Sequence, residues 1–214
     1  MKILAIVPIK KNLNSKLKLR CFENVLKLQT YFQNTIDIYL DDRGPGDSMF
    51  MDFCSRERIK VLACVRQSMI NDYLRPEHTH VLMVDADVEY TPKTVTDLLR
   101  TSKVDIVAPA ILAVGGDDWW YDTWGFFDEN GKHANKQSPY FDGNKRVVEL
   151  SSVGTMYLVP ADLFRMGAMY RETDGNTEHY SVCAFAKSKG IKTLCNLDVV
   201  VRHPRLDDYG ERRE

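Results

Sequence analysis

Short apolar runs and amphipathic segments alternate along the first forty residues. Residues 3–7 form a continuous apolar run that ends at Pro8, which is typical of a strand buried on both faces. Residues 36–40 alternate between apolar and polar and lead into the turn sequence of 41–46, which predicts a second strand. Between them, residues 16–32 repeat apolar positions every three or four residues and predict an amphipathic helix, whose apolar positions are Leu19, Phe22, Val25, Leu26, Leu28 and Phe32.

The same alternation continues to about residue 110. It predicts strands over 60–65, 79–84 and 104–109, and a helix over 67–74. Thr91 and Pro92 have the order of an N-cap followed by a first helical residue, so a further helix begins there. Strands that alternate with helices predict an α/β, Rossmann-like fold: a mixed, mostly parallel sheet flanked by helices, with ligands at the carboxyl ends of its strands.

The second half of the chain has a different pattern. Residues 114–146 are rich in Gly, Asp, Asn and aromatic residues and show no sustained period, which predicts long functional loops. Beyond them we expect strands over 147–150, 155–159 and 191–201, a short helix over 161–166, and a helix over 178–189 that Gly190 ends.

Composition narrows the class of protein. The chain has 214 residues, of which 44% are hydrophobic and 28% charged, so we expect one globular domain and exclude a disordered or membrane-spanning protein. The five cysteines contain no C-x-x-C pair, which argues against a disulfide framework and a structural zinc site. The apolar run at 3–7 is too short for a secretory signal. We therefore expect no transmembrane segment and a cytoplasmic location.

The net charge of −1 hides an uneven distribution. The first 36 residues hold seven Lys or Arg residues against the single acid Glu23, so the remainder of the chain is acidic. Two interpretations are open: an anionic partner binds near the N-terminal strand, or the lysines form an ordinary solvated helix face.

Asp85 and Asp87 carry the most informative chemistry. They follow the apolar run 81–84 directly, with one residue between them. Two carboxylates at the tip of a strand can converge on one divalent cation, which can also bind the phosphate oxygens of a substrate. Such a cation stabilises the charge that develops on a nucleoside diphosphate as it leaves a sugar.

At this point the chain resembles the nucleotide-sugar-dependent glycosyltransferases of the GT-A fold. Five segments are similar to that family, in the family's order: the opening strand at 3–9, Leu40-Asp41-Asp42-Arg43-Gly44, Val84-Asp85-Ala86-Asp87, the G-x-x-L-V-like segment at 152–159, and Glu178-His179-Tyr180-Ser181-Val182-Cys183. The resemblance implies a single GT-A domain over 1–214, with a nucleotide-sugar-binding half at 1–110, an acceptor-binding half at 111–202 and a tail at 203–214.

The resemblance also implies roles for individual residues. Pro8 and Asp42 flank the nucleobase and ribose, Arg66 approaches the nucleotide from a strand end, and Gly154 lies beneath the acceptor site. Asp87 binds the cation directly, while Asp85 lies near the ribose or reaches the metal through water. His203 is a further metal ligand, and its imidazole favours Mn²⁺ over Mg²⁺. In relatives a C-terminal segment closes over the donor phosphates, and Arg202 or Arg205 is the candidate for this role here; the alternative is a frayed chain end.

All three tryptophans lie within residues 119–128, a loop sequence flanked by Gly and Asp. Some of these rings are expected at a binding surface, where they stack on a sugar. The Y-D-x-W part resembles a segment of fungal mannosyltransferases, although Phe127 stands where an Arg often precedes the later Asp. We expect Trp120 and Trp124 to contact substrate and Asp122 to belong to the catalytic groups.

An inverting enzyme needs a general base for the acceptor hydroxyl, and Glu178 is the candidate. Its alternative role is that of an acid stabilised at a helix N-terminus. The family's second acid is His179 here, so either Glu178 or His179 takes over as base, or the enzyme is retaining.

The sequence therefore predicts a metal-dependent glycosyltransferase that uses a nucleotide-sugar, with UDP favoured over GDP. The alternatives are a sugar-phosphate nucleotidyltransferase, which would need glycines that residues 8–12 lack, and a non-catalytic nucleotide- or carbohydrate-binding module. The acceptor stays open among a polysaccharide, a lipid-linked group, a protein and a hydroxymethylated base in viral DNA.

Overall fold

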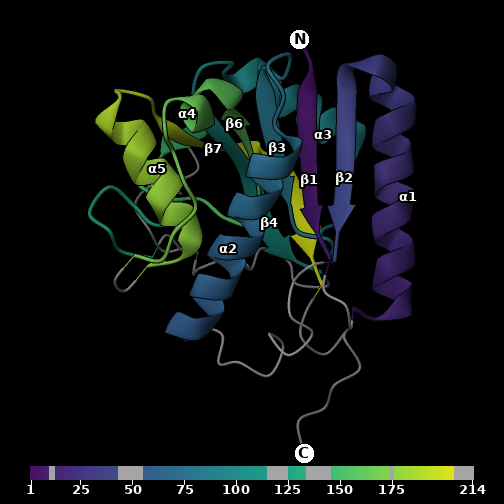
Figure 1. Ribbon diagram of the computed structural model, residues 1–214, viewed down its shortest axis with the longest axis horizontal. Coiled ribbons are helices and arrows are strands. Elements are labelled where there is room, and N and C mark those ends of the chain that lie inside the picture. Colours follow the sequence, from purple (N-terminus) through teal and green to yellow (C-terminus); the bar gives the residue numbers. More distant parts are fainter. Residues whose placement is uncertain (10–12, 43–54, 115–124, 134–145, 174–175, 205–214) are drawn as a thin grey trace, which may run out of the picture.

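Seven strands form one mixed sheet with helices on both of its faces (Figure 1). The computed structural model describes residues 1–9, 13–42, 55–114, 125–133, 146–173 and 176–204. The strands are β1 (Ile3–Pro8), β2 (Ile36–Asp41), β3 (His80–Val84), β4 (Ile106–Ala113), β5 (Val147–Glu149), β6 (Met156–Pro160) and β7 (Thr193–His203). The helices are α1 (Ser15–Phe32), a 3-10 turn η1 (Gln33–Thr35), α2 (Arg56–Tyr73), α3 (Pro92–Thr101), α4 (Ala161–Arg165) and α5 (Glu178–Ser188).

The strand order is β2-β1-β3-β6-β4-β7-β5. Strand β1 pairs in parallel with β2 and β3, and β4 pairs in parallel with β7. Strand β6 is antiparallel to both β3 and β4, and β5 is antiparallel to β7. The α/β class and the mixed sheet predicted from the sequence are confirmed, with parallel pairing in three of the six strand pairs.

The parallel strands β1, β2 and β3 end at one edge of the sheet, the lower edge in Figure 1. Every residue of β3 is fully buried, and β1 is buried from Ile3 to Val7, as continuous apolar runs predict for strands covered on both faces. This central core fixes the positions of the residues that follow each strand.

The strand predicted over 60–65 is wrong. These residues belong to α2, an 18-residue helix that Ser55 caps by accepting a hydrogen bond from the backbone N–H of Arg58 at 3.3 Å. A short apolar run fits a buried strand and a helix segment equally well, and here Ala63, Met69 and Ile70 share the buried face of the helix.

The helix predicted over 16–32 is confirmed as α1, but only half of its predicted apolar positions face the core: Leu28 is buried, and Val25 and Phe32 pack against the core. Its buried residues are Leu17, Cys21, Asn24 and Leu28. Leu19, Phe22 and Leu26 point outward and are largely exposed. Because α1 carries apolar residues around much of its circumference, spacing alone did not tell which face packs against the sheet.

The predicted start of α3 is confirmed. Pro92 is its first residue, and Thr91 and Thr94 form a reciprocal capping box. None of the helices in the described part of the chain is long and apolar enough to cross a membrane.

Candidate active site

The carboxyl edge of β1 and β2 brings two predicted donor-binding residues together. Pro8 ends β1 opposite Asp41, and the backbone N–H of Ile9 donates to the Asp41 carbonyl oxygen at 2.8 Å. The Asp41 side chain is buried and accepts a hydrogen bond from the Tyr73 hydroxyl at 3.0 Å. Asp42 is exposed immediately beyond it, so Asp42 is the carboxylate that this edge offers to a ligand.

Asp87 and His203 lie side by side, although 116 residues separate them in the sequence. The Nε2 atom of His203 is 3.2 Å from Oδ1 of Asp87, and both side chains are less than a tenth exposed. Backbone hydrogen bonds between Glu89 and Arg202, of 2.7 and 3.1 Å, hold the segment after Asp87 against the end of β7. The sequence predicted both residues as ligands of one cation, and the fold places them within reach of one.

The hydrogen bonds of His203 favour metal binding through Nε2. Its Nδ1 lies 2.7 Å from the Pro204 carbonyl oxygen, which can only accept, so Nδ1 carries a proton. Burial lowers the pKa of His203, but the hydrogen bond and charge of Asp87 outweigh it and leave that pKa above the ordinary value. A cation bound by Asp87 would replace the second proton and take the Nε2 lone pair.

Asp85 is held away from this pair. Its Oδ1 accepts a hydrogen bond from a terminal nitrogen of Arg66 at 2.7 Å, and its backbone N–H donates to the Thr155 carbonyl oxygen at 2.9 Å. The buried residue Gly154 therefore lies in the segment that packs against the tip of β3. Arg66 reaches Asp85 from the middle of α2, so its predicted place at a strand end is wrong.

Arg66 also binds Glu178, and the two form a buried ion pair. The Nε of Arg66 donates to Oε1 of Glu178 at 3.0 Å, and each side chain is only 4% exposed. Burial alone would raise the pKa of Glu178, but the charges of His179 and Arg66 lower that pKa by more than burial raises it. The pKa therefore lies below the ordinary value, and the carboxylate is charged. In this structure the Glu178 carboxylate is buried against Arg66, which it helps to position, and its role as general base stays a prediction.

His179 extends the same network into the core. Its Nε2 lies 3.3 Å from Oε1 of Glu178, and its Nδ1 lies 2.8 Å from the hydroxyl of Tyr157. The Tyr157 hydroxyl is 2.7 Å from that of Tyr170. His179 therefore contributes to the buried support of Asp85 through Glu178 and Arg66. The sequence gave no signal for the two tyrosines, because they lie on β6 and in the connection to α5.

The donor set fits a divalent cation in part. Carboxylate and imidazole together suit Mn²⁺ better than Mg²⁺. Within the described ranges, no group of three or more His, Cys, Asp or Glu side chains is arranged to hold one ion, since Asp85 is bound to Arg66. Asp87 and His203 would supply two ligands to a bound cation, and water or phosphate oxygens would have to complete the shell.

Other predicted residues have different outcomes. Trp120, Asp122 and Trp124 lie outside the described residues, and their roles stay predictions. Arg202 is paired through its backbone with Glu89, and its guanidinium donates to the Ala113 carbonyl oxygen at 3.3 Å. Phe127, in the part of the tryptophan-containing segment 119–128 that the structure describes, is buried against the rings of His133 and Tyr180.

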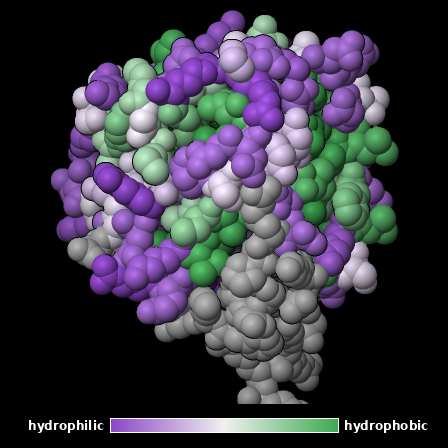
Figure 2. Space-filling model, in the orientation of Figure 1, coloured by the Kyte–Doolittle hydropathy of each residue, from purple (hydrophilic) through white to green (hydrophobic). Residues whose placement is uncertain are grey.

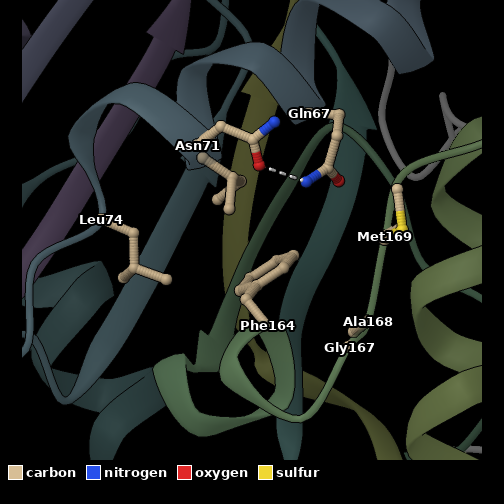
Figure 3. A pocket seen from close by; sticks show the side chains of 8 residues that line it. Gln67, Asn71, Leu74, Phe164, Gly167, Ala168 and Met169 are labelled. Carbon is tan, nitrogen blue, oxygen red and sulfur yellow. Dashed lines mark hydrogen bonds between the residues drawn. The ribbon is translucent and has the colours of Figure 1, made fainter.

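A shallow hollow of about 350 Å³ lies further along α2 (Figure 3). Gln67 and Asn71 line it on one side, and Phe164 and Met169 line it on the other. Gln67 donates to Asn71 at 2.8 Å and accepts from the Tyr170 backbone N–H at 2.9 Å, so these polar groups satisfy one another. The α2 residues that line this hollow follow Arg66 over the next two turns of the helix. We assign no ligand to the hollow.

Two solved glycosyltransferase structures share this fold. GalNAc-T7 in complex with UDP, GalNAc and Mn²⁺ matches with a TM-score of 0.60 and 13% identity, over 95% of this chain and 43% of its own. The Drosophila β-1,4-galactosyltransferase 7 in complex with manganese, UDP-Gal and xylobiose matches with a TM-score of 0.52 and 10% identity, over 99% of this chain and 74% of its own. This chain thus spans less than half of the first protein. The likeness confirms the predicted GT-A fold, the fold of a class of glycosyltransferases.

The match to a family model is more specific. The model of the Anp1 family, a family of mannosyltransferases, matches residues 34–139, which is just under half of the chain. No curated protein sequence matches the chain. The fold and the Anp1 match together support the glycosyltransferase predicted from the sequence.

Proposed function

We propose that this protein is a metal-dependent glycosyltransferase that moves a sugar from a nucleotide-sugar to an acceptor hydroxyl. The observation that carries the proposal is the pairing of Asp87 with His203 at 3.2 Å, at the sheet edge where Pro8 ends β1 and Asp42 follows β2. A carboxylate and an imidazole beside an exposed nucleotide-binding edge match the needs of a donor bound through its diphosphate.

UDP is the first donor nucleotide to test. Both solved glycosyltransferases described above contain UDP or a UDP-sugar together with manganese. A GDP-sugar is the second, because the Anp1 family is a family of mannosyltransferases.

Each residue then has a defined task. Asp87 and His203 hold the cation, which when bound supplies positive charge to the departing nucleoside diphosphate. Asp42 accepts hydrogen bonds from the nucleoside, and Asp85, fixed by Arg66, approaches the ribose. Glu178 and His179 hold Arg66 in place. If the enzyme inverts the anomeric centre, Glu178 or His179 is the base that takes the acceptor proton, and Asp122 is a further candidate.

The test is a panel of UDP- and GDP-sugars, each incubated with the protein and Mn²⁺ and read out as released nucleoside diphosphate. We expect turnover with one donor, increased by an acceptor, with Mg²⁺ less effective than Mn²⁺. Acceptors include a lipid-linked group, a polysaccharide, a protein and DNA that carries hydroxymethylated bases, the last suggested by the basic N-terminal sequence.

Asp87→Asn should abolish the released product. Asp162→Asn is the matched control, since Asp162 is exposed on α4 and pairs only locally with Arg165. Donor binding without turnover for any donor and acceptor would instead favour a non-catalytic binding module. Release of pyrophosphate from a nucleoside triphosphate and a sugar phosphate would favour a nucleotidyltransferase.

A further inference from the structure

Helix α1 presents an apolar stripe to solvent on the side opposite its buried face. Leu19, Phe22 and Leu26 are 61%, 53% and 67% exposed. Their spacing of three and four residues places them on one face of the helix. In Figure 2 apolar side chains gather along the edge of the molecule where Figure 1 places α1. The helix is therefore apolar on two faces, and the described part of the chain covers only one of them.

Basic side chains flank this stripe. Lys16 and Lys27 are exposed and eleven residues apart, so they lie almost in line on one side of it. Lys18 lies on the other side, and Glu23 is the sole acid in the helix sequence. Leu and Phe between lysines form the pattern of a helix that lies in a membrane interface, where the lysine stems extend toward lipid head groups.

We propose that α1 docks this protein onto an anionic membrane surface, with Leu19, Phe22 and Leu26 inserted among the lipids and Lys16, Lys18 and Lys27 at the head groups. The charge of the helix selects this occupant, because the apolar stripe needs a partner that is both apolar and negatively charged. The proposal concerns the outward face of α1 and does not depend on glycosyl transfer.

Two other partners, a second copy of the chain and a nucleic acid, fit the apolar stripe of α1 less well than a membrane does. A second copy packed through the same face would bring the lysines of both helices together, and three side chains bury far less than the ~800 Å² per partner of a stable interface. A nucleic acid would satisfy the lysines, but it would leave the apolar stripe in contact with phosphates and water.

The inner face of α1 connects this surface to the candidate active site. Arg20 forms an ion pair with Glu89, and the side-chain amide of Asn24 donates to the Val88 carbonyl oxygen at 3.1 Å. The helix that would rest on the membrane thus also supports the segment that carries Asp87.

The test is sedimentation of the whole protein with lipid vesicles, made of phosphatidylcholine alone or with a third of phosphatidylserine. We expect at least tenfold stronger binding to the anionic vesicles. The double variant Phe22→Ser/Leu26→Gln should lose at least tenfold of that binding. Lys16→Gln/Lys27→Gln should lose about fivefold for each lysine. Tyr31→Ser is the matched control, because Tyr31 is 58% exposed on the same helix but lies away from the stripe, and its binding should stay within twofold.

Three outcomes would overturn the proposal. One is the absence of binding to anionic vesicles, or binding that the Phe22 and Leu26 substitutions leave unchanged. A second is a dimer in light scattering that dissociates in the Phe22→Ser/Leu26→Gln variant, which would assign the stripe to a second copy. The third is tighter binding to duplex DNA than to the vesicles. Circular dichroism of each variant verifies the fold, and no donor is present, so a failure here leaves the proposed activity untouched.

Discussion

Replacing Arg66 by Met should destabilise the protein strongly. Arg66 is 4% exposed and donates to two carboxylates, at 2.7 Å to Asp85 and 3.0 Å to Glu178. Asp85 is 31% exposed, so water can solvate it when Arg66 is gone, whereas Glu178 would remain buried and charged without the Arg66 guanidinium. Loss of one partner from a buried ion pair costs about 3–5 kcal/mol. In a chain of this length that corresponds to a fall of about 10 °C in Tm.

Urea unfolding followed by circular dichroism measures this cost. The double variant Arg66→Met/Glu178→Met should regain most of the loss, because it removes the stranded charge together with the arginine. The pH dependence provides a second test. In the wild type the lowered pKa of Glu178 contributes stability above the ordinary carboxyl pKa that is lost as the pH falls. In Arg66→Met the buried carboxylate should instead favour the proton, so mild acid should relieve part of the defect. A loss below about 1 kcal/mol in Arg66→Met would refute the network as described.

Three smaller predictions follow from single contacts. Thr91→Ala removes half of the capping box of α3 and should cost about 1 kcal/mol in urea unfolding, whereas the exposed Thr30→Ala on α1 should change little. Burial lowers the pKa of His80, so the unfolded chain binds a proton that the folded protein does not, and stability should fall as the pH drops from about 7 to about 5. This loss of stability with falling pH should be smaller in His80→Gln than in the wild type. An equal loss in the two proteins would contradict the assignment to His80. Tyr157→Phe leaves His179 and Tyr170 without the shared hydroxyl and should cost about 1–3 kcal/mol by thermal unfolding; a neutral effect would show that the network adds nothing to stability.

The sheet and its functional edge follow from local patterns. The buried strands β1 and β3 are continuous apolar runs, and Asp85 and Asp87 come directly after one of them, so their place at a strand end was predictable. The start of α3 was predictable for the same reason, since a cap depends on neighbouring residues only.

What the sequence did not predict depends on long-range packing. The apolar run at 60–65 fits a strand or a helix, and only the contacts of α2 with the rest of the fold decide between them. The pairing of Arg66 with Glu178 joins residues 112 positions apart. The buried tyrosines of the His179 network, Tyr157 and Tyr170, lie on β6 and in the connection to α5. Helix α1 has apolar residues on two faces, and the sequence does not say which of them the sheet covers.

The most direct test of the account is a calorimetric titration of UDP and of GDP into the protein with and without Mn²⁺, for the wild type, Asp87→Asn and His203→Ala. The account predicts that one nucleotide binds at least tenfold more tightly with Mn²⁺ present, and that either substitution removes this gain while Asp162→Asn keeps it. Binding of both nucleotides that is indifferent to Mn²⁺, or a Mn²⁺ gain that survives the loss of Asp87, would contradict it.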